Sequence, residues 1–158
     1  MKKFVPILLV LLILLGTANA DGIRMYVLCK PGDYVNVREN PSTKSAVAGY
    51  LECGYEVETD GKTKKDNQGR EWTHLTEPML ECSDVWVCSM YLQDTKVTIQ
   101  ELTGKIHSKG RTAVRRSPGG KIIKWLRNGD DVSILAMSGE WALTTRGYVR
   151  SEYIEVSE

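Results

Sequence analysis

The chain contains an internal repeat, which restricts it to folds that can be built twice. A Val-Arg pair and a following proline stand in Tyr34–Pro41, and the same residues return at the same spacing in Thr112–Pro118. Further pairs follow in the same order: Leu51, Gly54 and Val57 with Leu126, Gly129 and Val132; Trp72 with Trp141; and Val87, Ser89 and Tyr91 with Val149, Ser151 and Tyr153. The matched residues are small, apolar or aromatic, as expected of a repeated core. The sequence therefore predicts two copies of one small unit.

Each copy has the pattern of short strands separated by turns. Tyr34–Arg38 alternates, with Val35 and Val37 on one face and Asn36 and Arg38 on the other. Turn residues recur roughly every ten positions, and no segment after the first twenty residues has a helical period. We predict an all-β fold with about five short strands in each copy. The first unit is placed at 21–93 with a loop insertion near 76–84, a connector at 94–101 and the second unit at 102–158.

The first twenty residues have the features of an export signal. Lys2 and Lys3 precede an apolar run over 4–15, and Ala18-Asn19-Ala20 offers small residues for cleavage. The run is shorter than the roughly 20 residues that span a bilayer, although an uncleaved anchor is the alternative. We expect cleavage after Ala20, no stable membrane span afterwards, and a secreted or cell-envelope location, either extracellular or periplasmic.

Charge and cysteine content limit the partners. The chain has 21 basic and 20 acidic residues, which gives no electrostatic case for nucleic acid, although local basic residues from Arg111 to Arg127 favour either an anionic polymer or a solvated face. Four cysteines, an even number in an exported chain, predict two disulfides with three possible connectivities; they are Cys29, Cys53, Cys82 and Cys88. We favour Cys29–Cys53 with Cys82–Cys88. A four-cysteine zinc site is the alternative, but without a C-x-x-C pair we expect neither metal nor cofactor.

These motifs together resemble the bacterial SH3-like (SH3b) module. The first copy shows Val35–Arg38, Gly49–Val57, Trp72, Val85–Val87 and Tyr91-Leu92; the second shows Thr112–Arg115, Leu126–Val132, Trp141, Gly147–Val149 and Tyr153-Ile154. The resemblance implies two small SH3-like barrels in tandem. It also implies a role in attaching exported proteins to the bacterial cell wall through peptidoglycan peptides or glycan. Val85 in place of glycine, Ala113 in place of asparagine and the insertion near 76–84 depart from the family pattern and affect any inherited ligand preference.

Catalysis has little support in the residue types. His74 and His107 are the only histidines, and His107 aligns with Lys30 at an expected surface position. A dyad of His74 with a cysteine would supply a nucleophile and a base. Exported cysteines in an even set are usually oxidised and inert, so we expect no enzymatic activity.

Recognition is the remaining function, and aromatic and polar side chains are its candidates because rings provide contact area at low entropic cost. Trp72 and Trp141 keep their place in both copies, which favours the core, whereas Trp125 faces outward if Leu126 faces inward. The candidate ligand-binding residues are Tyr34, Asn36, Asn40, Trp86, Tyr91, Arg115, Trp125, Tyr148 and Tyr153. Arg38 and Arg115 alternatively pair with Glu39 or Asp131. The expected function is peptidoglycan or envelope binding; the alternatives are docking of an exported protein partner and, third, a small hydrolase.

Overall fold

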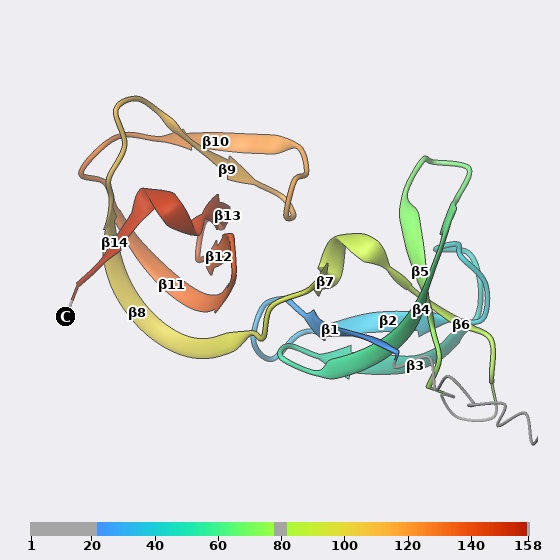
Figure 1. Ribbon diagram of the computed structural model, residues 1–158. Coiled ribbons are helices and arrows are strands. Elements are labelled where there is room, and N and C mark those ends of the chain that lie inside the picture. Colours follow the sequence, from blue (N-terminus) through green and yellow to red (C-terminus); the bar gives the residue numbers. More distant parts are fainter. Residues whose placement is uncertain (1–21, 78–81, 158) are drawn as a thin grey trace, which may run out of the picture.

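The protein is built from two antiparallel β-sheets of seven strands each, which confirms the all-β prediction (Figure 1). The computed structural model describes residues 22–77 and 82–157. The predicted export signal at 1–20 lies outside the described residues, as do residues 78–81 of the predicted insertion. Within the described part of the chain, no helix is long and apolar enough to cross a membrane.

The first sheet has the strand order β3-β2-β6-β5-β4-β1-β7. Its strands are β1 (Ile23–Val27), β2 (Tyr34–Arg38), β3 (Val47–Glu52), β4 (Glu56–Lys65), β5 (Glu71–Leu75), β6 (Val85–Cys88) and β7 (Leu92–Gln93). A single 3₁₀ turn, η1 (Ser89–Tyr91), separates β6 from β7.

The second sheet has the order β10-β9-β13-β12-β11-β8-β14. Its strands are β8 (Thr98–Ile106), β9 (Thr112–Arg115), β10 (Ile122–Leu126), β11 (Asp131–Ser138), β12 (Trp141–Thr144), β13 (Gly147–Arg150) and β14 (Ile154–Val156), with η2 (Ser151–Tyr153) before the last strand. Replacing each strand of the first sheet by its repeat counterpart reproduces this order. The repeated sequence therefore has a repeated topology.

Seven strands per sheet, not five, is a correction to the sequence prediction. The additional pairing comes partly from β7 and β14, which are two and three residues long and follow the 3₁₀ turns. It also comes from β8, which begins at Thr98 inside the predicted connector and pairs with β11. Residues 98–101 are all exposed, so the alternation of buried and exposed side chains that indicates a strand is absent there. Backbone pairing alone defines this part of β8.

The matched apolar residues form the cores of both sheets. Val35 and Val37 of β2 are buried while Asn36 between them is exposed, as the alternation predicts. The buried repeat pairs are Val37 and Val114, Leu51 and Leu126, Val57 and Val132, and Val87 and Val149. A core of nearly the same composition is thus enclosed twice.

Two tryptophans form a separate buried cluster in the first sheet. Trp72 and Trp86 are 2% and 3% exposed and pack with Cys88. The Trp72 indole N–H donates to Asp66 at 3.2 Å, and that of Trp86 donates to Asp84 at 3.0 Å. The core position predicted for Trp72 is therefore confirmed. Trp86, a candidate ligand-binding residue from the sequence, is also buried, because its strand β6 lies between two neighbours and both of its faces are covered.

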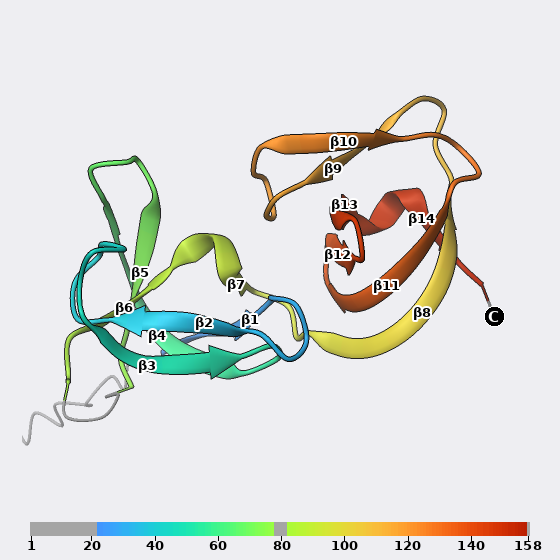
Figure 2. The same cartoon turned by 180° about the vertical axis from the view of Figure 1, so that it is seen from behind.

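The two sheets pack against each other through a further apolar cluster. Leu28 and Val97 meet Ala136, Leu143 and Tyr148 of the second sheet, and all five are buried. The Tyr148 hydroxyl donates a hydrogen bond of 3.1 Å to the Leu28 carbonyl, and the Ser138 hydroxyl donates to the Thr95 carbonyl. Figures 1 and 2 show the two sheets side by side, joined by the segment from β7 to β8.

Truncating this contact tests whether it stabilises the protein. Leu28→Ala removes a side chain with no exposed surface, which predicts a loss of about 2–5 kcal/mol in the free energy of unfolding. Urea denaturation measures this loss. Ile123→Ala is the control, because Ile123 is 49% exposed and its truncation is expected to cost about 0.5 kcal/mol or less. Equal effects of the two substitutions contradict a packed contact between the sheets.

Candidate functional site

A groove of about 880 Å³ lies where the two sheets meet, and we call it the intersheet groove. The first sheet contributes Lys30, 33–36, Arg38 and Tyr91 to its lining, and the second sheet contributes Arg116 and 144–148. Both walls consist largely of loop and strand-end residues. Packing of the two sheets is therefore a condition for this groove to exist.

A second groove, of about 900 Å³, belongs to the second sheet alone, and we call it the second-sheet groove. Its lining includes 107–113, Arg115, Trp125, Asn128, Arg150 and 152–153. Positions related by the repeat line both grooves: Lys30 and His107, Asn36 and Ala113, Arg38 and Arg115, Cys88 and Arg150, Met90 and Glu152, and Tyr91 and Tyr153. The same place on the repeated unit is hollow in both copies.

The matched arginines make the same structural bond in both copies. Arg38 Nη1 donates to the Ser45 carbonyl at 2.6 Å, and Arg115 Nη1 donates to the Gly120 carbonyl at 2.7 Å. These carbonyls belong to the loops that follow β2 and β9. Each arginine therefore holds the loop beside its groove, which differs from the pairing with Glu39 or Asp131 considered from the sequence.

Exposed aromatic rings stand at both grooves. In the intersheet groove, Tyr34 is 60% exposed and meets Tyr50 edge-on at 6.3 Å between ring centroids. In the second-sheet groove, Trp125 is 50% exposed, as predicted from its place beside the buried Leu126. Exposed rings beside polar groups are the chemistry of peptide and carbohydrate recognition.

Both grooves are positively charged although the chain as a whole is nearly neutral. Lysine and arginine supply five residues of the intersheet lining, against one acid, Asp33. They supply four in the second-sheet groove, against Glu152. Part of this charge is compensated, because Arg70 pairs with Asp66 at 2.8 Å and Arg150 pairs with both Glu140 and Glu152. The uncompensated remainder favours anionic groups in a ligand.

The structure brings most of the sequence-predicted candidates to these grooves. Tyr34, Asn36 and Tyr91 line the intersheet groove, and Arg115, Trp125 and Tyr153 line the second-sheet groove. Tyr148 also lines the intersheet groove, but it is 6% exposed and its hydroxyl is engaged with Leu28. Burial raises the pKa of Tyr148, so its hydroxyl stays a donor.

Two predicted candidates are not placed in either groove. Asn40 lines neither, and its amide groups approach the Ser45 hydroxyl. Trp86 is in the buried cluster. Sequence reasoning missed Arg70, Arg116 and Arg146 as groove residues. The basic stretch around Arg116 was a partial signal, but Arg146 reaches the groove only through packing of the sheets.

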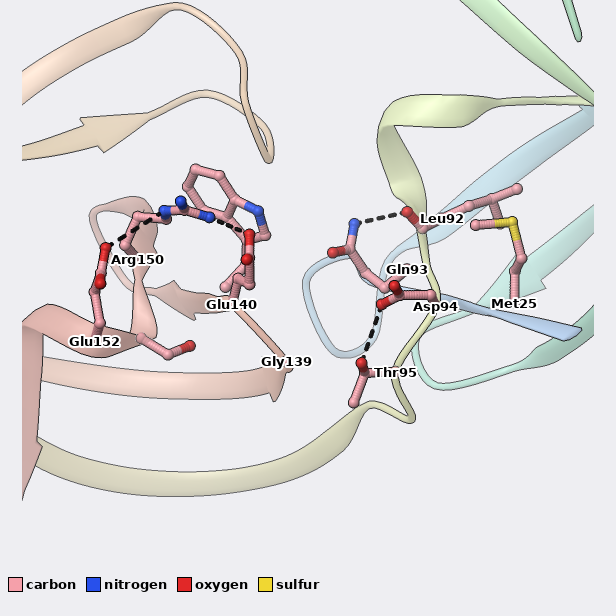
Figure 3. A pocket seen from close by; sticks show the side chains of 11 residues that line it. Met25, Leu92, Gln93, Asp94, Thr95, Gly139, Glu140, Arg150 and Glu152 are labelled. Atoms are coloured by element: carbon pink, nitrogen blue, oxygen red, sulfur yellow. Dashed lines mark hydrogen bonds and ion pairs between the residues drawn. The ribbon is translucent and has the colours of Figure 1, made fainter.

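A third hollow, of about 700 Å³, lies beside the segment that connects the sheets (Figure 3). Arg150 lies between Glu140 and Glu152 there, at 3.7 Å from Glu152, and faces Gln93–Thr95 across the gap. Its guanidinium is also 5.3 Å from the centroid of the Trp141 ring. The charged groups satisfy one another, so this hollow offers less to a ligand than the two grooves.

His74 is held by carboxylates. Its Nδ1 and Nε2 atoms lie 3.1 Å from Asp60 and 3.3 Å from Asp84, and its ring packs on Trp86 at 5.1 Å between centroids. The Nδ1 contact is at ion-pair distance but lacks hydrogen-bond alignment. Among the described residues, no group of three or more His, Cys, Asp or Glu side chains is arranged to hold a metal ion.

Two of the four cysteines, Cys29 and Cys53, interact with each other. Cys29 and Cys53 are free thiols, and their interaction raises the pKa of Cys29 and lowers that of Cys53 to about 7, while the Cys29 thiol donates to the Asp33 carbonyl at 3.6 Å. Cys88 is a buried thiol in the tryptophan cluster, and the Cys82 Sγ lies 3.7 Å from a Glu39 oxygen. Contact between Cys29 and Cys53 is compatible with their predicted disulfide, while both predicted disulfides stay predictions.

Alkylation kinetics test the thiol pair. In the reduced protein, Cys53 is expected to react with iodoacetamide at a rate that rises with pH through a midpoint near 7, because only the thiolate reacts. Mass spectrometry of peptides measures this rate. Cys29→Ala removes the thiol that interacts with Cys53 and is expected to move the midpoint toward 9.0, the ordinary value. A midpoint near 9.0 in the unsubstituted protein contradicts an interaction between the Cys29 and Cys53 thiols.

The matches to known proteins are confined to solved structures of low similarity. No protein-family model and no curated protein matches the chain. Similar solved structures are NlpC2 and NlpC1 from Trichomonas vaginalis, at 17% and 16% identity, both covering 86% of this chain with a TM-score of 0.31. A putative autolysin from Listeria monocytogenes matches at 17% identity over 85% of the chain, with the same TM-score. The chain spans 48%, 46% and 62% of these three proteins. Similarity at this level does not establish a shared activity.

Proposed function

We propose that this chain is an exported, non-catalytic protein that binds peptidoglycan of the bacterial cell envelope. The observation that carries the proposal is the pair of grooves at repeat-equivalent positions, each with an exposed ring and an excess of basic side chains. The SH3b-like motifs and the export-signal pattern in the sequence support the same function.

Peptidoglycan matches the chemistry of the grooves. Its glycan offers faces on which Tyr34 and Trp125 stack, and its peptides offer amides and carboxylates to the basic side chains. Peptidoglycan is also a repeating polymer, so two grooves on one chain can be occupied together. Occupation of one groove then raises the effective concentration of ligand at the other, which strengthens weak individual contacts.

The environment of the reactive side chains supports a role without catalysis. A nucleophile needs a base within hydrogen-bond reach. The side chain of His74 contacts Asp60, Asp84 and the Trp86 ring, and the Cys29 and Cys53 thiols interact with each other. Neither histidine lines the intersheet groove, where Cys29 lies.

Co-sedimentation with purified peptidoglycan tests the proposal. The mature protein is expected to bind saturably, and Tyr34→Ala and Trp125→Ala are each expected to weaken binding roughly tenfold through loss of ring contact. Tyr55→Ala is the matched control, because Tyr55 is 46% exposed but lines neither groove. Absence of sedimentation by the unsubstituted protein contradicts the proposal, and chitin serves as the polymer control.

A second candidate function is docking of an exported protein partner. In the strand order, β3 and β10 stand at the ends of their sheets, and an extended peptide can add to an edge strand. These strands expose Tyr50, which is 64% accessible, and Ile123. Recovery of a specific exported protein by pull-down, together with no affinity for peptidoglycan, favours this function instead.

A further inference from the structure

We infer that the intersheet groove is a composite site for a peptide carboxylate, in which Arg116 and Arg146 of the second sheet act together with Lys30 and Arg38 of the first. The inference rests on the proposed function, because it names the part of peptidoglycan that this groove would take. It adds one requirement to the proposed function: residues of both sheets must be present to form the site.

The turn that carries Arg146 is fixed by its own hydrogen bonds. The Arg146 backbone N–H donates to the Thr144 hydroxyl at 3.1 Å, and that hydroxyl donates to the Gly147 carbonyl at 2.8 Å. Gly147 has a φ of 125°, and a Cβ placed there would lie 2.7 Å from the Arg115 carbonyl. The turn therefore lies tightly against β9, next to Arg116, and both arginines stand at the same end of the neighbouring strands β9 and β13.

This end of strands β9 and β13 is linked to the opposite wall of the groove. Tyr148 follows this turn directly, and its hydroxyl donates to the carbonyl of Leu28. Leu28 in turn stands two residues before Lys30, which lines the first-sheet wall. A buried hydrogen bond of 3.1 Å thus links the two walls near the groove and keeps their basic residues on either side of one space.

Charge is left uncompensated across this space. The charge of Arg70 is compensated by its ion pair with Asp66. Arg38 donates one hydrogen bond to the Ser45 carbonyl and keeps its positive charge. Arg116 and Arg146 are both exposed. The positive charge of Arg146 contributes to lowering the pKa of Asp131, although the main partner of Asp131 is Lys105 at 2.6 Å. Asp33 is the one acid in the groove lining, so a bound anion meets a net positive field.

The rest of the lining favours a peptide over a phosphate polymer. Leu135 and Met90, both half-buried, provide apolar surface, which methyl groups of small residues can cover and a polyphosphate chain cannot use. Asp33 repels a polyanion but can accept a hydrogen bond from an amine on the ligand. The groove volume also lies within the roughly 300–1,000 Å³ typical of small-ligand sites. Arginine suits the carboxylate because its planar fork donates two parallel hydrogen bonds.

Calorimetric titration with a peptidoglycan stem tetrapeptide tests the inference. The peptide with a free terminal carboxylate is expected to bind at least tenfold more tightly than the same peptide amidated at that end. Arg116→Gln and Arg146→Gln are each expected to weaken binding of the free acid about tenfold and to remove most of its advantage over the amide. Arg127→Gln removes one charge from an exposed arginine outside the groove and is expected to change affinity less than twofold.

Three results overturn the inference. These are equal binding of acid and amide, unchanged binding by both Arg116→Gln and Arg146→Gln, and tighter competitive binding of inorganic polyphosphate, which would assign the groove to a phosphate polymer. Co-sedimentation of the same variants separates this inference from the proposed function. If the unsubstituted protein sediments with peptidoglycan but does not distinguish acid from amide, only the composite carboxylate site fails.

Discussion

The intersheet groove depends on the buried contact between Leu28 and Tyr148. Each sheet encloses its own core, so either could exist without the other as far as its packing is concerned. The intersheet groove cannot exist on one sheet alone, because its two walls come from different sheets. A small apolar cluster and a hydrogen bond of 3.1 Å place those walls opposite each other. The contact is stabilised by the apolar area that it removes from water. It is stabilised further because breaking the hydrogen bond would leave the buried Leu28 carbonyl unpaired.

Duplication has produced two related grooves with different properties. Cys88 and Met90 of the first copy correspond to Arg150 and Glu152 in the second, so apolar surface is replaced by charge. The second-sheet groove is also lined by one sheet, whereas the intersheet groove has a wall on each side. We expect the two grooves to differ in ligand preference. Conservation of the Arg38 and Arg115 bonds to their loops keeps the same framework in both.

Much of the fold follows from the sequence because it depends on local alternation and on the repeat. Val37 and Val114 are recognisable as core residues from their strand pattern and from each other. The additional strands β7 and β14 are too short to show a pattern, and pairing with β1 and β8 defines them. The burial of Trp86 could not be predicted, because both faces of β6 are covered and one sequence does not show which strand becomes central.

The candidate site was predictable only in part. Tyr34, Arg115 and Trp125 stand on strands whose exposed faces can be read from alternation. Arg146 lies in a turn, and its role depends on how two sheets pack, which the sequence of either copy does not contain. The same holds for the link from Tyr148 to Leu28, since these residues are 120 positions apart.

Backbone ¹⁵N relaxation of the reduced, mature protein tests the packing of the two sheets most directly. If the contact through Leu28 and Tyr148 holds, amides of β2 and β9 share one rotational correlation time, as expected for a single body of this size. Two shorter and different correlation times would show that the sheets tumble independently. In that case the intersheet groove would not persist in solution, and a composite site would be excluded.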